Sequence, residues 1–200
     1  MIRPAAKAAL VALALSTTAL SPMAFAAPAA ASISVPPIVY KERVLANGLK
    51  VFTVRDTTTP NVSVQVWYGV GAKDDPAGRS GFAHLFEHLM FKATRDMPSE
   101  SFDRMTEDVG GFNNASTADD FTDYYEVIPA NHLQRLLWAE ADRMSTLVVD
   151  EASFKSERDV VKEELRLRVL SDPYGRFFRI VIPDASYTTH PYKRPGIGSI

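Results

Sequence analysis

Two histidines and a glutamate lie close together in an apolar segment of the chain. Residues 84–88 read His-Leu-Phe-Glu-His and contain two of the four histidines in the 200-residue sequence. A helix places residues i and i+4 on one face, so the imidazoles of His84 and His88 would converge, and neutral imidazole is a good zinc ligand. Glu87 adjoins His88, which places its carboxylate near the same point as a general base toward a water. The plainer interpretation is a pair of core or surface histidines at helical spacing.

A third metal ligand has to come from elsewhere in the chain, because catalytic zinc usually takes three protein ligands. The sequence contains no cysteine, which leaves His132, His190 or a carboxylate. Residues 151–170 form an amphipathic stretch in which successive side chains are rotated by about 100° if it is helical. On that helix Glu164 borders the apolar stripe, whereas Glu163 points to the opposite side. Glu164 is therefore the carboxylate that we expect to face inward.

Glu157 borders the same stripe, seven residues before Glu164. Two carboxylates on the core-facing side of a helix are costly unless a cation compensates them, and a divalent metal with its imidazoles would do so. We expect Glu157 to orient a ligand through a hydrogen bond. The alternative is a solvated charged face, in which Arg158, Lys162 and Arg166 form ion pairs with these glutamates.

Turn signals and apolar periodicity predict the elements that would position these side chains. Asn47-Gly48 between two β-prone runs predicts a hairpin with a type I′ turn, which needs positive φ at both residues. Alternation over residues 62–68 predicts a third strand. Two more strands are expected over residues 111–117 and 122–128, and helices over 81–91, 101–109, 131–145 and 151–170. This order indicates an α+β fold, in which helices cover a largely antiparallel sheet.

The first 26 residues have the layout of a secretory signal peptide. Arg3 and Lys7 precede an apolar run over residues 8–20, and Ala24-Phe25-Ala26 supplies a small-x-small cleavage site. The run is shorter than the roughly 20 residues that span a bilayer, so we expect no stable membrane anchor. Residues 27–37 are rich in Ala and Pro and predict a tether before a folded domain over residues 38–200. The expected location is exported, either periplasmic or secreted.

Composition narrows the class of protein and the kind of metal site. With 46% apolar and 23% charged residues, the chain can form a domain with a hydrophobic core, which excludes disordered, collagen-like and polytopic membrane classes. The formal net charge of -2 gives no reason to expect nucleic acid as a partner. The lack of cysteine excludes disulfides, thiolate zinc sites and a cysteine nucleophile. Histidine and carboxylate ligands accept zinc, manganese or cobalt, so the residues alone leave the metal open.

From the Asn47-Gly48 hairpin onward, the chain resembles the pitrilysin/insulinase family of zinc metallopeptidases. The matching segments are Gly-Phe-Ala-His-Leu-Phe-Glu-His at 81–88, Gly-Gly-Phe-Asn-Asn-Ala-Ser-Thr at 110–117, Glu-Arg-Asp-Val-Val-Lys-Glu-Glu at 157–164 and His-Pro-Tyr at 190–192. The HxxEH motif of inverted zinc peptidases, with a glutamate 76 residues after its second histidine, is a specific combination. The resemblance implies zinc bound by His84, His88 and Glu164, water activated by Glu87, and Glu157 in its predicted role.

The resemblance also implies how substrate binds. Asn114 and Ala115 match positions on an edge strand to which an extended peptide adds as a further strand. The plainer interpretation of this segment is a Gly-Gly turn into a surface strand.

Family members have at least two related halves that enclose a chamber, with an Arg and a Tyr of the later half binding substrate. Those residues have no counterpart in this sequence, so we expect a C-terminal half or a second subunit to complete the chamber. The implied function is a zinc-dependent endopeptidase that hydrolyses peptides or small or unfolded proteins. The alternative is a noncatalytic peptide-binding or assembly subunit that partners an active chain. Such subunits usually have a degraded metal motif, whereas the motif here is intact.

Overall fold

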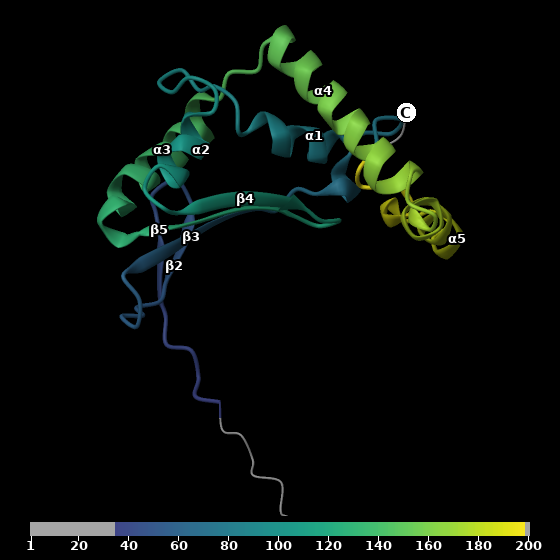
Figure 1. The fold of residues 1–200 in the computed structure, drawn as a ribbon. Coiled ribbons are helices and arrows are strands. Elements are labelled where there is room, and N and C mark those ends of the chain that lie inside the picture. The colour runs from purple at the N-terminus through teal and green to yellow at the C-terminus, as the bar shows by residue number, and fades with distance from the viewer. Residues whose placement is uncertain (1–34, 199–200) are drawn as a thin grey trace, which may run out of the picture. The chain divides into compact units, whose positions relative to one another are not determined.

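The computed structural model describes residues 35–198, so the predicted signal peptide and most of the predicted tether lie outside the described residues. The chain divides into two compact units between Arg55 and Asp56, and each unit is described by itself. The first unit contains the antiparallel hairpin of β1 (Lys41–Val44) and β2 (Lys50–Thr53), shown in Figure 1. The hairpin predicted around Asn47-Gly48 is therefore confirmed.

The turn of this hairpin differs from the predicted type I′ turn. Val44 pairs with Lys50, so five residues separate the two strands. The Gly48 N–H donates to the Leu45 carbonyl at 2.9 Å, and Gly48 has a φ of 87°. Asn47 is not among the described residues with positive φ, and its side-chain oxygen instead accepts from the Leu49 N–H at 3.1 Å. The longer loop needs only one left-handed residue, whereas a two-residue type I′ turn needs two.

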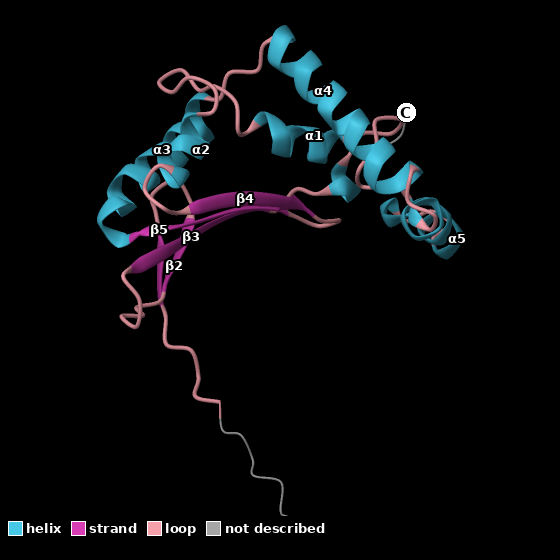
Figure 2. Ribbon diagram, in the orientation of Figure 1, coloured by secondary structure: helices cyan, strands magenta, loops and turns pink. Residues whose placement is uncertain are grey.

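The second unit is built on a three-stranded antiparallel sheet, coloured magenta in Figure 2. Its order is β3 (Asn61–Tyr68), β5 (Thr122–Pro129) and β4 (Phe112–Thr117), so β5 is central. In β3, exposed and partly buried side chains alternate along the strand, as the sequence pattern predicts for a strand with one buried face. Within this sheet β4 has a single neighbouring strand, which leaves its other side as an edge.

Five α-helices accompany the sheet in the described part of the chain. They are α1 (Phe82–Leu89), α2 (Ser101–Glu107), α3 (Leu133–Thr146), α4 (Glu151–Leu165) and α5 (Ile182–Ser186). A π-helical turn over residues 166–170 extends α4, and another over 177–181 leads into α5. Helix α1 lies between the sheet and α4, as Figure 2 shows. The predicted α+β class is thus confirmed, and no helix within residues 35–198 is long and apolar enough to cross a membrane.

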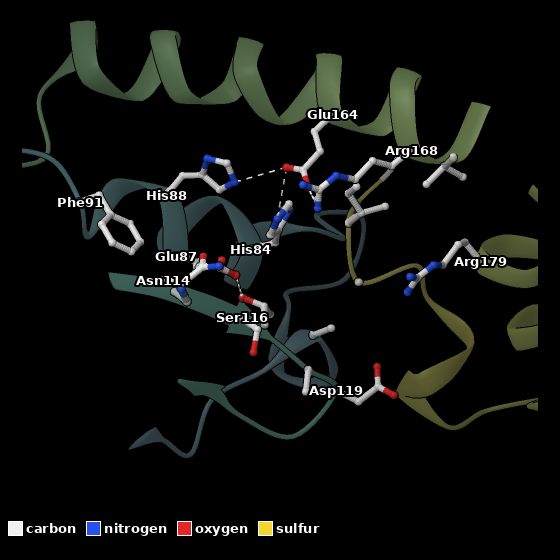
Figure 3. Close-up of a pocket in the computed structure, with 17 residues that line it drawn as sticks. His84, Glu87, His88, Phe91, Asn114, Ser116, Asp119, Glu164, Arg168 and Arg179 are labelled. Atoms are coloured by element: carbon white, nitrogen blue, oxygen red, sulfur yellow. Dashed lines mark hydrogen bonds and ion pairs between the residues drawn. The ribbon is translucent and has the colours of Figure 1, made fainter. Parts of the chain in front are cut away.

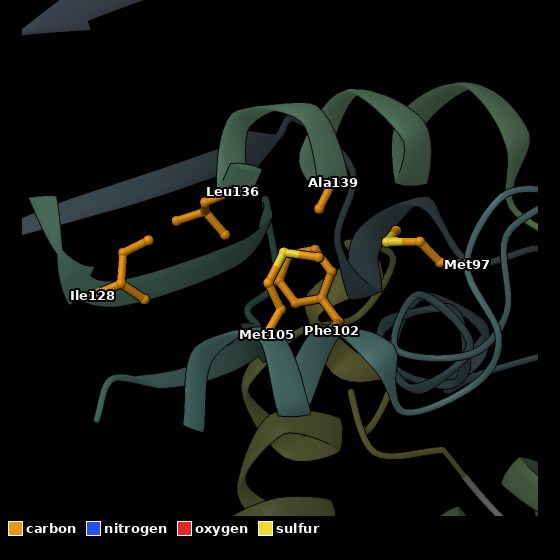
Figure 4. Packing of buried hydrophobic residues seen from close by; sticks show 6 residues of the cluster. All are labelled: Met97, Phe102, Met105, Ile128, Leu136 and Ala139. Carbon is orange, nitrogen blue, oxygen red and sulfur yellow. The ribbon is translucent and has the colours of Figure 1, made fainter. Parts of the chain in front are cut away.

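Two apolar clusters hold the helices in place. The larger one packs α2 and α3 against the sheet and contains Met97, Phe102, Met105, Ile128, Leu136 and Ala139 (Figure 4). The smaller one joins α1 to α4 through Leu85, Leu89 and Val161, with Phe154 packed beside them. The smaller cluster sets the distance between α1 and α4, the two helices that contain the candidate metal ligands.

A charged cluster is buried between α3 and the sheet. Arg143 has 1% of its surface exposed, and it donates hydrogen bonds to Glu140 and, at 3.4 Å, to Glu126 Oε1. Its guanidinium carbon lies 4.2 Å from the centre of the Phe102 ring and 4.4 Å from that of Tyr124. Burial, reinforced by the charge of Glu140, raises the pKa of Glu126 to about 9. Glu126 therefore holds a proton at neutral pH, and the cluster carries less net negative charge than its residue types suggest.

Candidate metal centre

The start of α1 is fixed by the side chain of Asp75, which is 6% exposed. Its carboxylate accepts hydrogen bonds from the backbone N–H groups of Gly81 at 2.6 Å and Ala83 at 2.8 Å. These N–H groups belong to the first turn, where a helix leaves its donors without internal partners. His84 follows directly, so its backbone position depends on this cap.

Three side chains from α1 and α4 converge on one point, as Figure 3 shows. The imidazole rings of His84 and His88 are perpendicular, with centroids 4.9 Å apart. Glu164 Oε2 lies 3.6 Å from His84 Nε2 and 3.4 Å from His88 Nε2. One ligand atom from each residue lies within 4.8 Å of the others, and no other such group of three potential ligands occurs in the part of the chain that the structure describes.

These donors fit a zinc ion in chemistry and spacing. Two ligand atoms at about 2.0–2.1 Å from a tetrahedral zinc are about 3.3 Å apart, close to the carboxylate-to-imidazole distances seen here. Burial lowers the pKa of His84, against the opposing charge of Glu164, and so favours the neutral imidazole that binds metal. Two imidazoles and one carboxylate also leave a fourth position open, as in catalytic zinc sites.

Neighbouring charged side chains contact His88 and Glu164 on the sides that face away from their meeting point. Glu157, 5% exposed, places Oε2 at 3.5 Å from His88 Nδ1, the nitrogen on the far side of the ring from Glu164. Its other oxygen contacts Lys92 Nζ at 2.8 Å. Glu164 Oε1 contacts the Arg168 guanidinium at 2.7 Å. The two carboxylates are thus each oriented by a cation, and sequence reasoning identified neither Lys92 nor Arg168.

Glu87 lies beside the three converging side chains and has a partner of its own. Thr117, at the end of β4, donates its hydroxyl to Glu87 Oε2 at 2.5 Å. Burial raises the pKa of Glu87, and the hydrogen bond from Thr117 partly offsets that rise. No signal in the sequence pointed to Thr117, because the contact joins residues 30 positions apart.

The three converging side chains and Glu87 line a cavity of about 760 Å³. Its lining includes Glu87, Phe91, the β4 residues 114–117, Arg168, Arg179 and Ile197 (Figure 3). Asn114 and Ala115 therefore line the same cavity as the converging histidines. The Asn114 side-chain oxygen accepts from the Ala115 N–H at 2.9 Å, so it occupies a backbone donor of this strand.

The other candidates from the sequence lie away from this group. His132 ends a short turn before α3. His190 packs on Tyr192 with ring centroids 4.3 Å apart. Glu163, adjacent to Glu164, is exposed and pairs with Arg166 at 2.9 Å, as its predicted outward direction requires.

Comparison with known proteins gives consistent matches over most of this chain. The family model described as insulinase, peptidase family M16, matches residues 50–188. The zinc protease PqqE of Helicobacter pylori is 38% identical over 156 residues, which cover 77% of this chain and 35% of that protein. The crystal structure of a protease from Helicobacter pylori aligns with a TM-score of 0.77 at 35% identity, over 80% of this chain and 39% of that one. The crystal structure of pitrilysin aligns with a TM-score of 0.72 at 25% identity, over 80% of this chain and 17% of the pitrilysin chain. The chain thus spans about a third of the length of the PqqE relative.

Proposed function

The chain belongs to the insulinase family of peptidases, family M16, and from this premise we propose that it contains the metal-binding and water-activating part of a zinc metalloendopeptidase. The observation that supports this proposal most directly is the convergence of His84, His88 and Glu164, with Glu87 beside them. The name of the PqqE relative, a zinc protease, supports zinc as the metal.

The three converging side chains would hold the ion, and their neighbours would keep them in place. When bound, zinc supplies Lewis acidity that lowers the pKa of water and polarises the scissile carbonyl. Glu157 Oε2 lies 3.5 Å from His88 Nδ1 and would keep Nε2 directed at the ion. Arg168 holds Glu164 Oε1, which leaves Oε2 for the ion.

Glu87 is the general base of the proposed reaction. Its Oε2 is occupied by the Thr117 hydroxyl, so Oε1 is the atom that takes the proton from the attacking water. The same oxygen then delivers that proton to the nitrogen of the departing amine. Burial raises the pKa of Glu87, which makes the protonated form easier to reach in the first step.

The substrate would be an extended peptide that lies along β4. This strand has one neighbour in its sheet and forms a wall of the cavity through Asn114 and Ala115. A peptide added as a further strand would use the free backbone groups of this edge. We propose that the Asn114 side chain turns away from the Ala115 N–H when a peptide arrives.

Full activity is proposed for a complete protein and not for these 200 residues alone. The PqqE relative is almost three times as long as the part that matches, and a C-terminal half or a second subunit would enclose the cavity. We also propose that the protein works in exported space, on the basis of the leader-like residues 1–26.

The test combines metal content with turnover. In the complete protein, Glu87→Gln should keep bound zinc and lose peptidase activity by at least about a hundredfold, the usual contribution of a general base. Glu164→Gln should lose zinc. Glu163→Gln is the matched control, because it makes the same change one residue away on an exposed carboxylate paired with Arg166. Metal analysis after dialysis and hydrolysis of a fluorogenic peptide measure the two effects. Full activity in Glu87→Gln would refute the proposal, and zinc bound with activity absent in the wild type would favour the noncatalytic alternative.

A further inference from the structure

Residues 190–198, here called the strap, follow α5 and run against two loops of the second unit. The sequence singled out His-Pro-Tyr at 190–192 without assigning it a role. Tyr192 donates its hydroxyl to Asp120 Oδ2 at 2.6 Å, and Lys73 contacts the other oxygen of that carboxylate at 2.7 Å. The strap is therefore attached to the turn between β4 and β5, and Lys73 joins that turn to the loop that precedes α1.

Arg194 makes the more buried part of this attachment. Its guanidinium donates to the Lys73 carbonyl at 2.7 Å and to the Asp75 carbonyl at 2.5 Å. The first carbonyl lies within the short turn of residues 72–74, and the second belongs to Asp75, which ends it. Asp75 is also the residue whose carboxylate caps the first turn of α1 at Gly81 and Ala83. One guanidinium thus holds the backbone of the residue that fixes the start of α1.

The strap also touches the start of α1 directly. Gly81 and Gly198 have φ values of 91° and 97°. A Cβ atom on Gly81 would lie 2.5 Å from the Gly198 Cα, and one on Gly198 would lie 2.8 Å from the Ser80 carbonyl oxygen. Ser80 Oγ donates to the Pro195 carbonyl at 2.7 Å. The two backbones therefore meet where neither glycine has room for a side chain.

We propose that Arg194 is a positioning residue for the metal centre, acting through Asp75 on the place of His84. His84 is the third residue of α1 and adjoins Ala83, whose N–H the Asp75 carboxylate holds. The partner ligand, Glu164, comes from α4, so the distance between the two ligands depends on where α1 begins. Gly196 and Ile197 of the strap line the same cavity. The inference rests on the proposed function only in taking His84 as a metal ligand.

The test measures metal affinity and not turnover. Zinc dissociation constants for the whole chain are obtained by competition with a chromophoric chelator, and the absorption spectrum of bound Co²⁺ reports ligand geometry. We expect Arg194→Ala to weaken zinc binding about tenfold, the lower end of what residues behind metal ligands contribute, and to change the Co²⁺ spectrum. Arg194→Lys should fall between it and the wild type, because one ammonium does not reproduce the two-pronged guanidinium contact.

Lys193→Ala is the matched control. It removes the same charge from the neighbouring position of the strap, where the lysine contacts Asp184 at 3.3 Å on the surface. Its zinc affinity should stay within twofold of the wild type. Circular dichroism at the assay temperature checks that each variant is folded, and if Arg194→Ala is not folded, Arg194→Lys decides.

Three outcomes would overturn the inference. The first is a folded Arg194 variant with wild-type zinc affinity and Co²⁺ spectrum. The second is equal weakening by Arg194→Ala and Lys193→Ala, which would indicate only a general effect of charge or fold. The third is a wild-type chain that binds no zinc. This outcome would refute the proposed function as well, whereas the first two would refute only the role of Arg194.

Discussion

Replacing Glu126 by glutamine should remove part of the pH dependence of the stability of this chain. The pKa of Glu126 is raised to about 9 by burial and by Glu140, from an ordinary value of 4.5. The folded state therefore keeps a proton that the unfolded state releases as pH rises. The stabilisation is fully present below pH 4.5 and is lost as the pH rises toward 9. Glutamine keeps the shape of the protonated side chain and has no such proton to lose.

The size of the effect follows from proton linkage. One proton bound only in the folded state changes the free energy of unfolding by about 1.4 kcal/mol per pH unit. Between pH 5 and pH 8 the upper bound is therefore about 4 kcal/mol, reduced where Arg143 and Glu140 share the change in charge.

Urea unfolding at pH 5, 6, 7 and 8 measures this effect as the difference between Glu126→Gln and the wild type. The contributions of other titrating groups to the free energy of unfolding are the same in both proteins and cancel in that difference. His84 is one of them, since its lowered pKa gives stability that increases with pH, the opposite sign. We expect the free energy of unfolding of Glu126→Gln, relative to that of the wild type, to rise by about 2–4 kcal/mol from pH 5 to pH 8. Glu107→Gln, on an exposed position of α2, should give a constant difference. A Glu126→Gln difference that is constant, or that falls as the pH rises, would refute a protonated Glu126.

Three further changes test single contacts. Glu157→Gln should weaken zinc binding about tenfold in a chelator competition, because it loosens the hold on His88 Nδ1; unchanged affinity would show that this contact does not orient the ring. Thr117→Val in the complete protein should lower kcat by about tenfold with zinc content unchanged, since one hydrogen bond of about 1–1.5 kcal/mol to the proposed base is lost; equal kcat would contradict that role. Asp150→Ala should lower the free energy of unfolding by about 1 kcal/mol in urea, because Asp150 Oδ1 accepts from the Ser153 N–H at the start of α4. A change below about 0.3 kcal/mol would indicate that water replaces this cap.

The sequence by itself determined most of the elements up to residue 170 and the inward-facing side chains, because both depend on the local repeat of the backbone. It did not indicate the π-helical turn over residues 177–181 or α5. Helical spacing placed His84 and His88 on one face of α1, and the apolar stripe of α4 separated Glu164 from Glu163. The alternating residues of β3 and the Asn-Gly pair of the hairpin likewise lie within a few positions of one another. Such patterns encode which way a side chain points, since the period of an element is a local property of the backbone.

Only the tertiary structure decided which side chains meet across elements. Thr117 reaches Glu87, Lys92 reaches Glu157, and Arg194 reaches the backbone of Asp75 from 119 positions away. The turn at Gly48 also differs from its local signal, since its form depends on how the two strands pair. None of these contacts has a period or a spacing in the sequence. They arise when apolar packing between α1, α4 and the sheet sets the distances between elements, and that packing depends on the whole unit at once.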